Sequence, residues 1–194
     1  MIPAIQLARP TRWIASFAAA LLMVGANAQA QELDVPYVPT PMEIVDKMLD
    51  MAQVGRDDVV FDLGCGDGRI VTRAASARGA RGTGIDLDPR LIERANAGAL
   101  RAGVADRAKF VVGDLFEFDF SSASVVTLYL LPDVNEKLRP YLWRQLKVGT
   151  RVVSHDYDMG PGWPPEKVER LSDRKVLFYW TIRPEHKAAV AVKT

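Results

Sequence analysis

Three glycines and two aspartates alternate in the stretch DLGCGDG, residues 62–68, directly after the apolar run VVF. Gly64, Gly66 and Gly68 add no side-chain packing and cost backbone entropy. Their concentration indicates a site where the backbone must approach a ligand closely. The carboxylates of Asp62 and Asp67 favour a ligand that carries positive charge and no phosphate.

The spacing of these glycines distinguishes two kinds of ligand. The dinucleotide fingerprint G-x-G-x-x-G places a pyrophosphate on the N-terminus of the next helix. The glycines in this chain are spaced G-x-G-x-G, one residue shorter, and Asp67 at the helix start would repel a pyrophosphate. S-adenosylmethionine fits better, because it combines an ammonium, a sulfonium and a nucleoside. A dinucleotide-dependent oxidoreductase and a nucleotide-type fold with solvated acids remain as alternatives.

The elements that must position this loop alternate regularly along the chain. Strands are expected at 58–63, 81–86, 108–112, 123–130 and 149–154, and helices at 41–53, 68–78, 89–101 and 133–146. This alternation predicts a doubly wound parallel α/β sheet that binds its ligand at the carboxyl ends of the strands. Thr40, followed by Pro41 and Glu43, predicts a capping box for the first helix. The segments 175–182 and 186–193 are expected to add a closing pair of strands.

The first 30 residues have the pattern of a secretory signal peptide. Arg9 and Arg12 precede the apolar run WIASFAAALLMVGA, and an A-x-A cleavage pattern ends at Ala30. The apolar run is too short for a convincing membrane span. We expect residues 1–30 to be a signal peptide or N-terminal anchor, and residues 31–194 to form one domain. The expected location is periplasmic or secreted, with a membrane-anchored protein facing the cytoplasm as the alternative.

Composition excludes several other classes of function. The chain has 194 residues, 48% of them hydrophobic and 25% charged, which is ordinary for a globular protein. The net charge is +1 and no basic stretch is interleaved with aromatics, so no nucleic-acid partner is expected. The single cysteine, Cys65, excludes an intramolecular disulfide. His155 and His186 lie far apart in sequence, so no dedicated metal site is expected.

DLGCGDG resembles the first motif of class I S-adenosylmethionine-dependent methyltransferases. The resemblance implies a doubly wound, mostly parallel seven-stranded sheet with helices on both faces, and S-adenosylmethionine as the cofactor. It also implies that Asp86 holds the ribose hydroxyls, that Asp114 contacts the adenine amino group and that Asp62 faces the methionine ammonium. The cofactor-binding residues expected from this resemblance are Tyr37, Thr40, Asp62, Gly64, Cys65, Gly66, Gly68, Asp86, Leu87, Asp114 and Leu115.

The methyl acceptor is expected beside TLYLLPDVN, residues 127–135, after the fourth strand. This run lacks the N/D-P-P-Y/F motif of enzymes that methylate nucleobase amines or glutamine. Together with PYVPTP, residues 36–41, it resembles small prokaryotic relatives of the protein lysine methyltransferases of mitochondria and archaea. The resemblance implies that Tyr129 and Asn135 are catalytic and face the methyl group, and that the acceptor is a protein lysine.

Three points stay open at this stage. A small-molecule amine is the alternative acceptor, and a non-catalytic module that binds S-adenosylmethionine is the alternative to an enzyme. Tyr129 could instead be a core aromatic at a strand end. His155 and Asp156, after the fifth strand, either orient an acceptor or complete the strand with local hydrogen bonds.

Overall fold

The structure is a computed structural model that describes residues 37–171 and 174–191. All of these residues belong to one compact unit. The predicted signal peptide or anchor, residues 1–30, lies outside the described ranges and stays a prediction. Within those ranges, the structure contains no helix that is both long and apolar enough to cross a membrane.

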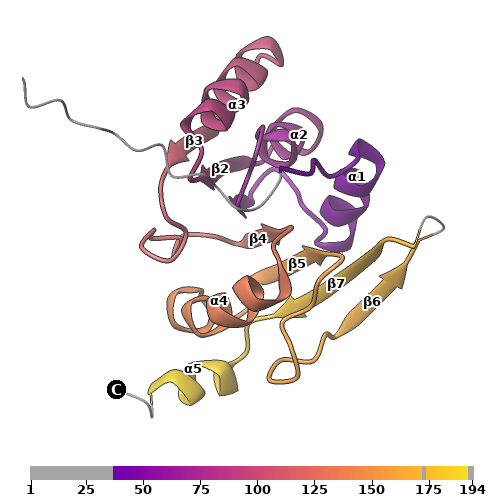
Figure 1. The fold of residues 1–194 in the computed structure, drawn as a ribbon, viewed down its shortest axis with the longest axis vertical. Coiled ribbons are helices and arrows are strands. Elements are labelled where there is room, and N and C mark those ends of the chain that lie inside the picture. Colours follow the sequence, from indigo (N-terminus) through magenta and orange to yellow (C-terminus); the bar gives the residue numbers. More distant parts are fainter. Residues whose placement is uncertain (1–36, 172–173, 192–194) are drawn as a thin grey trace, which may run out of the picture. The chain divides into compact units, whose positions relative to one another are not determined.

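A single mixed sheet runs through the described residues in the order β3-β2-β1-β4-β5-β7-β6 (Figure 1). Its strands are β1 (Val59–Leu63), β2 (Arg81–Asp86), β3 (Ala108–Val112), β4 (Val125–Leu128), β5 (Arg151–His155), β6 (Lys167–Arg170) and β7 (Val176–Thr181). The first five strands pair in parallel, whereas β7 pairs antiparallel with both β5 and β6. The predicted doubly wound, mostly parallel seven-stranded sheet is confirmed.

Helices cover both faces of this sheet because successive strand residues point in opposite directions. The helices are α1 (Met42–Met51), α2 (Arg69–Arg78), α3 (Pro89–Arg101), α4 (Pro132–Gln145) and α5 (Pro184–Ala191). On one face, Val60, Val125 and Val153 pack in a buried cluster with α1 and α2. On the other face, Phe61, Val126 and Val152 pack with α4. Alternation along the central strands thus builds two cores, one on each side.

The start of α1 differs from the prediction. The N-cap is Pro41, and no side chain caps the helix. Thr40 is buried, and its Oγ1 lies 3.2 Å from Nδ1 of His155. The capping-box prediction was wrong, because the Thr40 hydroxyl has a tertiary partner instead of a local one.

The C-terminal segment also differs from the prediction. Residues 186–193 were expected to form a strand, but residues 184–191 form α5, and β7 pairs with β6 instead. Pro184 is a favourable first residue for a helix. The helix packs on α4, where the His186 ring stacks on Trp143 at 5.1 Å and Lys187 Nζ donates to the Trp143 carbonyl at 2.8 Å. These contacts decide between strand and helix in a segment whose apolar pattern is ambiguous.

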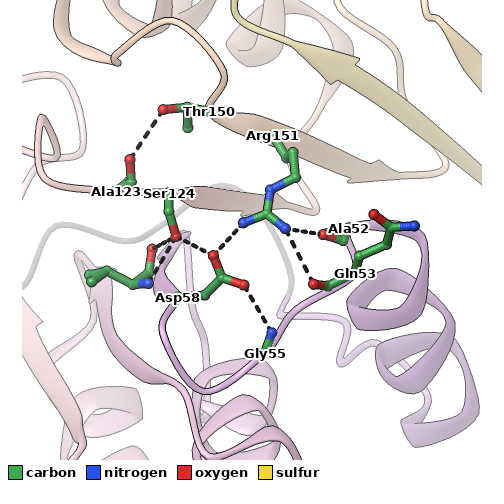
Figure 2. A network of polar contacts seen from close by, with 9 residues as sticks. Ala52, Gln53, Gly55, Asp58, Ala123, Ser124, Thr150 and Arg151 are labelled. Carbon is green, nitrogen blue, oxygen red and sulfur yellow. Dashed lines mark hydrogen bonds and ion pairs between the residues drawn. The ribbon is translucent and has the colours of Figure 1, made fainter.

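A polar network ties together the amino-terminal ends of the central strands (Figure 2). Arg151 at the start of β5 forms an ion pair with Asp58, just before β1, and donates to the Ala52 carbonyl at 2.6 Å. Ser124, just before β4, donates to Asp58 Oδ1 at 2.7 Å. Burial opposes ionisation of Asp58, but the Gly55 N–H, Ser124 and Arg151 outweigh it and lower its pKa. This network fixes the sheet at the edge opposite the glycine loop.

Candidate active site

The glycine loop joins β1 to α2 at the carboxyl edge of the sheet. Gly64, Gly66 and Gly68 have φ angles of +82°, +54° and +75°, all in the left-handed region. A side chain at Gly64 would overlap Leu130, and one at Gly66 would overlap the ring of Tyr37. Both the backbone conformation and the close neighbours therefore require glycine, as the sequence predicted.

The first N–H groups of this loop are hydrogen-bonded inside the protein. The N–H groups of Gly64 and Cys65 both donate to the Ile85 carbonyl at 2.9 Å, and the N–H of Gly66 donates to Asp86 Oδ2 at 2.8 Å. A phosphate nest needs such groups to be available to the ligand. The loop therefore does not fit a pyrophosphate. Burial raises the pKa of the Cys65 thiol, which makes Cys65 a packing residue rather than a nucleophile.

Asp62 lies at the point where the strand order reverses, between β1 and β4. It is only 2% exposed, and Thr127 of the neighbouring strand donates to its Oδ1 at 2.7 Å. Burial is the main cause that raises the pKa of Asp62 to about 7; the Thr127 hydrogen bond opposes it, and the charges of Asp86 and Asp67 add to it. A buried carboxylate of this kind is matched to a cationic ligand group.

Asp86 ends β2, next to the loop. Its two oxygens accept hydrogen bonds from the backbone N–H groups of Gly66 and Asp88, at 2.8 and 3.0 Å. Each carboxylate oxygen has a second lone pair, so Asp86 can still accept from two hydroxyl groups. The following residue, Leu87, is 54% exposed. A fixed carboxylate beside an exposed apolar side chain suits a nucleoside. The carboxylate can accept hydrogen bonds from the ribose, and the apolar side chain can pack against the base.

Asp114 follows β3, the next strand outward. Its Oδ1 accepts from the Phe116 N–H at 2.8 Å, and the side chain is exposed. The next residue, Leu115, packs against the buried cluster under α4. Asp62, Asp86 and Asp114 therefore stand at the same edge, because the carboxyl ends of parallel strands share it.

Residues 37–41, which we call the strap, connect to this edge through three contacts. Arg69 in the first turn of α2 donates from Nη1 to the Thr40 carbonyl at 2.9 Å. The Thr40 hydroxyl meets His155 at the end of β5. Tyr37 of the strap lies against the glycine loop. The strap thus links the loop after β1 to the end of β5.

Asp67 and Arg69 form a close ion pair at the start of α2. Nε of Arg69 lies 2.8 Å from Asp67 Oδ1, and Nη2 lies 2.6 Å from Oδ2. Burial opposes ionisation of Asp67, but the hydrogen bond and charge of Arg69 outweigh it and lower the pKa of Asp67. The helix N-terminus therefore already carries a carboxylate, which further disfavours a phosphate there.

An aromatic group lies at the ends of β4 and β5. The Tyr129 and His155 rings are in contact in a tilted arrangement, with centroids 4.1 Å apart and planes at 33°, and the Tyr157 ring is nearly parallel to that of Tyr129 at 6.3 Å. Lys175 Nζ lies 5.9 Å from the centroid of Tyr129 and forms an ion pair with Asp156 at 2.8 Å. His155 is fully buried. These side chains form a half-buried wall of the site, which we call the aromatic wall.

Asn135 lies in the first turns of α4 and is fully buried. Its Nδ2 donates to the carbonyls of Tyr157 and Asp158 at 3.2 and 3.1 Å, and lies 3.4 Å from Ser154 Oγ. Its Oδ1 is buried without a hydrogen-bond partner among the described residues. In this structure Asn135 holds the loop after β5, and a contact with the acceptor stays a prediction.

The structure thus brings the predicted residues to one edge of the sheet, and it adds partners that the sequence did not indicate. Thr127 lies under Asp62, Arg69 connects to the strap, and Lys175 lies over Tyr129. All three reach the site from other elements of the fold. No spacing along the chain indicates such pairs.

Comparison with known proteins identifies the family. A model of the ANTKMT methyltransferase domain matches residues 62–167, which is more than half of the chain. The chain belongs to the ANTKMT methyltransferase family. It is a class I methyltransferase dependent on S-adenosylmethionine, and the predicted family, enzyme class and cofactor are confirmed.

The relatives of this methyltransferase include proteins described as acting on different substrates. A protein-lysine N-methyltransferase of Saccharolobus islandicus is 45% identical over 156 residues, which cover 79% of this chain and 96% of the relative. The adenine nucleotide translocase lysine N-methyltransferase of Mus musculus is 34% identical over 83% of this chain and 69% of its own length. A crystal structure described as an RNA methyltransferase from Salinibacter ruber, in complex with S-adenosyl-L-homocysteine, has a TM-score of 0.74 and 56% identity. It covers 76% of this chain, and the match spans 95% of that protein.

Proposed function

We propose that this methyltransferase transfers a methyl group from S-adenosylmethionine to the ε-amine of a protein lysine. The archaeal relative described as a protein-lysine methyltransferase supports this substrate class. The observation that carries the proposal is the position of the run after β4. Leu130 lies directly against Gly64 of the cofactor loop, and the preceding residue, Tyr129, packs against His155 in the aromatic wall. The acceptor side of the site is therefore apolar and aromatic at the point where it meets the loop.

The residues present fit the cofactor. Asp62 offers a buried carboxylate to the methionine ammonium, Asp86 offers oxygens to the ribose, and Leu87 offers an apolar surface to the base. When bound, S-adenosylmethionine would supply a methyl group on its sulfonium sulfur, with a thioether as the leaving group. Within the described residues, no cluster of His, Cys, Asp or Glu could hold a metal ion.

The chain contributes alignment, water exclusion and a surface of low polarity on which the amine releases its proton to solvent before the transfer. A lysine amine has an ordinary pKa of about 10.4, so it arrives protonated and cannot attack. Leu130 and the rings of the aromatic wall lower the local polarity, which favours the neutral amine. The Tyr129 hydroxyl then orients the nitrogen of the acceptor lysine. The run after β4 is not fully packed, since Leu131 is 39% exposed, which supports an enzyme over a passive binding module.

A labelling experiment tests the acceptor class. Purified protein and S-adenosylmethionine with a labelled methyl group are added to lysate from cells that lack the enzyme. The products are separated into protein, RNA and small-molecule fractions, and labelled protein is hydrolysed to amino acids. We expect label in methyllysine. Label confined to RNA or to small molecules would overturn the proposal.

A second experiment tests the cofactor contacts. We expect Asp86→Ala to weaken binding of S-adenosylhomocysteine by about 1–3 kcal/mol in calorimetry, the scale of a hydrogen bond to a charged group. Asp106→Ala is the control, since Asp106 is exposed in the turn before β3. Equal affinities of the two variants would remove Asp86 from the cofactor site.

We also propose that residues 1–30 direct this methyltransferase out of the cytoplasm. The two arginines at positions 9 and 12, the apolar run and the A-x-A pattern support export. A fusion of residues 1–30 to a reporter that is active only outside the cytoplasm should show activity. A silent reporter, together with an intact Met1 on the native protein, would favour the anchor that faces inward.

A further inference from the structure

A groove of about 490 Å³ lies between α2 and α3, on the face of the sheet opposite α4. Figure 1 shows the two helices side by side. The charged side chains that line the groove are mostly positive. Four arginines line it, Arg69, Arg73, Arg94 and Arg101, against a single carboxylate, Asp67. The whole chain has a net charge of only +1, so this concentration of positive charge is local.

Helix geometry brings these arginines together. Arg69 and Arg73 are four residues apart on α2, and Arg94 and Arg101 are seven apart on α3, so each pair lies on one helix face. Gly98 lies between the α3 arginines, and a side chain placed there would meet only the Arg101 guanidinium, at 4.0 Å. The absence of a side chain at Gly98 keeps the groove open.

The two arginine pairs differ in their partners. Arg69 is paired with Asp67, and Arg73 forms two hydrogen bonds with Asp46 at 2.7 and 2.9 Å. Arg94 and Arg101 form no ion pair or hydrogen bond with the described residues, and both are exposed. The α3 side of the groove therefore carries two guanidinium groups whose donors are available to a ligand.

A buried hydroxyl lies in the same groove. Thr72 on α2 lines it, and its Oγ1 is buried without a hydrogen-bond partner among the described residues. A buried polar atom without a partner costs free energy. Because this oxygen has no exposed surface, a ligand in the groove reaches it only if neighbouring side chains shift.

The groove also connects to the active site. Tyr37 is one of its lining residues and lies against Gly66 of the cofactor loop. Arg69 lines it as well and donates to the Thr40 carbonyl in the strap. A chain lying in the groove would thus contact residues that also touch the cofactor loop and the strap.

We propose that this groove binds an acidic segment of the methyl-acceptor protein, an inference that rests on the proposed function. Guanidinium groups pair with carboxylates in a bidentate geometry, and Asp and Glu side chains on an extended segment present carboxylates at regular intervals. Single-stranded RNA is bound mainly through aromatic stacking platforms in a basic groove. Tyr37 is the one aromatic residue that lines this groove among the described residues. The charge without the stacking surface favours a polypeptide.

Binding is tested first, without turnover. A fluorescein-labelled peptide of ten glutamates is titrated with the purified protein at low salt, and fluorescence anisotropy is recorded. An unstructured oligoribonucleotide of equal charge is titrated in parallel. We expect the peptide to bind more tightly, and the double variant Arg94→Gln/Arg101→Gln to weaken it at least tenfold. The control is Arg56→Gln/Arg81→Gln, which removes two exposed arginines near the opposite edge of the sheet.

The outcomes of this titration are distinct. Preferential binding of the oligoribonucleotide would overturn the proposal in favour of a nucleic-acid groove. Equal weakening by both double variants would overturn it too, because binding would then depend on overall charge and not on the groove. Unchanged affinity for S-adenosylhomocysteine in both variants is the check that each is folded.

Turnover then connects the groove to the acceptor. Two lysine peptides are compared, one with a glutamate segment beside the lysine and one with a serine segment of equal length. We expect the acidic peptide to have the lower KM, and Arg94→Gln/Arg101→Gln to abolish that advantage while kcat changes little. Equal methylation of both peptides by the unmodified enzyme would contradict this inference. No methylation of either peptide or of any lysate protein would instead contradict the proposed function.

Discussion

At the scale of single residues, the chemistry of the site depends on a carboxylate that the fold has buried before any ligand arrives. Asp62 has one hydrogen bond, from Thr127, and no cation among the described residues. A buried carboxylate without a cation favours its neutral form. The pKa of Asp62 is about 7, so Asp62 is protonated when the pH is below this value. Under those conditions we expect the binding of an ammonium group to release the proton from Asp62.

This proton predicts a particular dependence of stability on pH. The pKa of Asp62 in the folded protein, about 7, exceeds the ordinary value of 3.8, so the folded state binds more protons between these values. Stability from this group is present below pH 3.8 and is lost as pH rises through 7. We expect Asp62→Asn, which keeps the Thr127 hydrogen bond, to remove the part of this loss that falls between pH 5 and pH 8, on the order of 3 kcal/mol. Thermal unfolding from pH 5 to 8.5 measures it.

The control for this prediction is Asp57→Asn, since Asp57 is exposed in the turn before β1. Its unfolding curve should follow that of the unmodified protein. Parallel curves for Asp62→Asn and the unmodified protein would show that Asp62 is ionised in the ligand-free state. Asp62→Asn should also bind S-adenosylhomocysteine more weakly, because the ammonium loses its counter-charge.

At the scale of elements, the strap is held to the sheet by few contacts. The Thr40 hydroxyl bonds to His155, and the Thr40 carbonyl accepts from Arg69. We expect Thr40→Val to remove the first contact at a cost of about 1 kcal/mol and to weaken S-adenosylhomocysteine binding about fivefold. Calorimetry measures the affinity. Thr181→Val on β7 is a matched control, and equal affinities of the two variants would separate the strap from cofactor binding.

The C-terminal helix α5 is expected to respond to acid. The Arg183 N–H donates to Nδ1 of His186, so this nitrogen must be unprotonated. Burial lowers the pKa of His186 below 6.5. The charge of Arg183 lowers this pKa further, whereas the charges of Glu185 and Glu166 oppose the shift. The contribution of His186 to stability is therefore present above pH 6.5 and is lost as pH falls through the folded pKa. We expect hydrogen exchange in 184–191 to be faster at pH 5 than at pH 7.5, beyond the intrinsic effect of pH. His186→Phe should abolish this difference, and a difference that persists in the variant would exclude His186 as its cause.

The elements show which parts of the fold the sequence determines. Strands β2 and β3 and helix α3 begin and end at the predicted residues. Helix α3 has an amphipathic pattern that begins at Asp88-Pro89, and the two strands are short segments between predicted helices and turns. The aspartates at the strand ends were predicted from the resemblance to the class I methyltransferase motif. The strap contact of Thr40, the helix at 184–191 and the position of Lys175 over Tyr129 depend on residues distant in sequence. The arginine groove was missed because its members are spread over two helices and form no basic run.

At the scale of the whole molecule, the two edges of the sheet have separate tasks. The network of Asp58, Ser124 and Arg151 lies at the amino-terminal edge (Figure 2), whereas the ligand site lies at the carboxyl edge. We expect Arg151→Met to destabilise the protein by about 3 kcal/mol, because Asp58 and the Ala52 carbonyl lose their partner. Urea unfolding measures this loss. Arg81→Met, an exposed position on β2, should cost little.

The same variant tests the independence of the two edges. Arg151→Met should bind S-adenosylhomocysteine with unchanged affinity at a temperature where it is fully folded. A weakened affinity under those conditions would show that the network also shapes the ligand site.

The hydrogen bond between Asp62 and Thr127 joins residues 65 positions apart in the chain. The ligand site therefore exists only after β1 and β4 have paired. A segment of the chain that lacks either strand cannot bind the cofactor in the same way. A ligand that binds only the folded state stabilises it by mass action, by about 2.7 kcal/mol at a hundred times its dissociation constant. The fraction of this enzyme that survives proteolysis should accordingly rise with the supply of S-adenosylmethionine, so that the abundance of the enzyme follows that of its methyl donor.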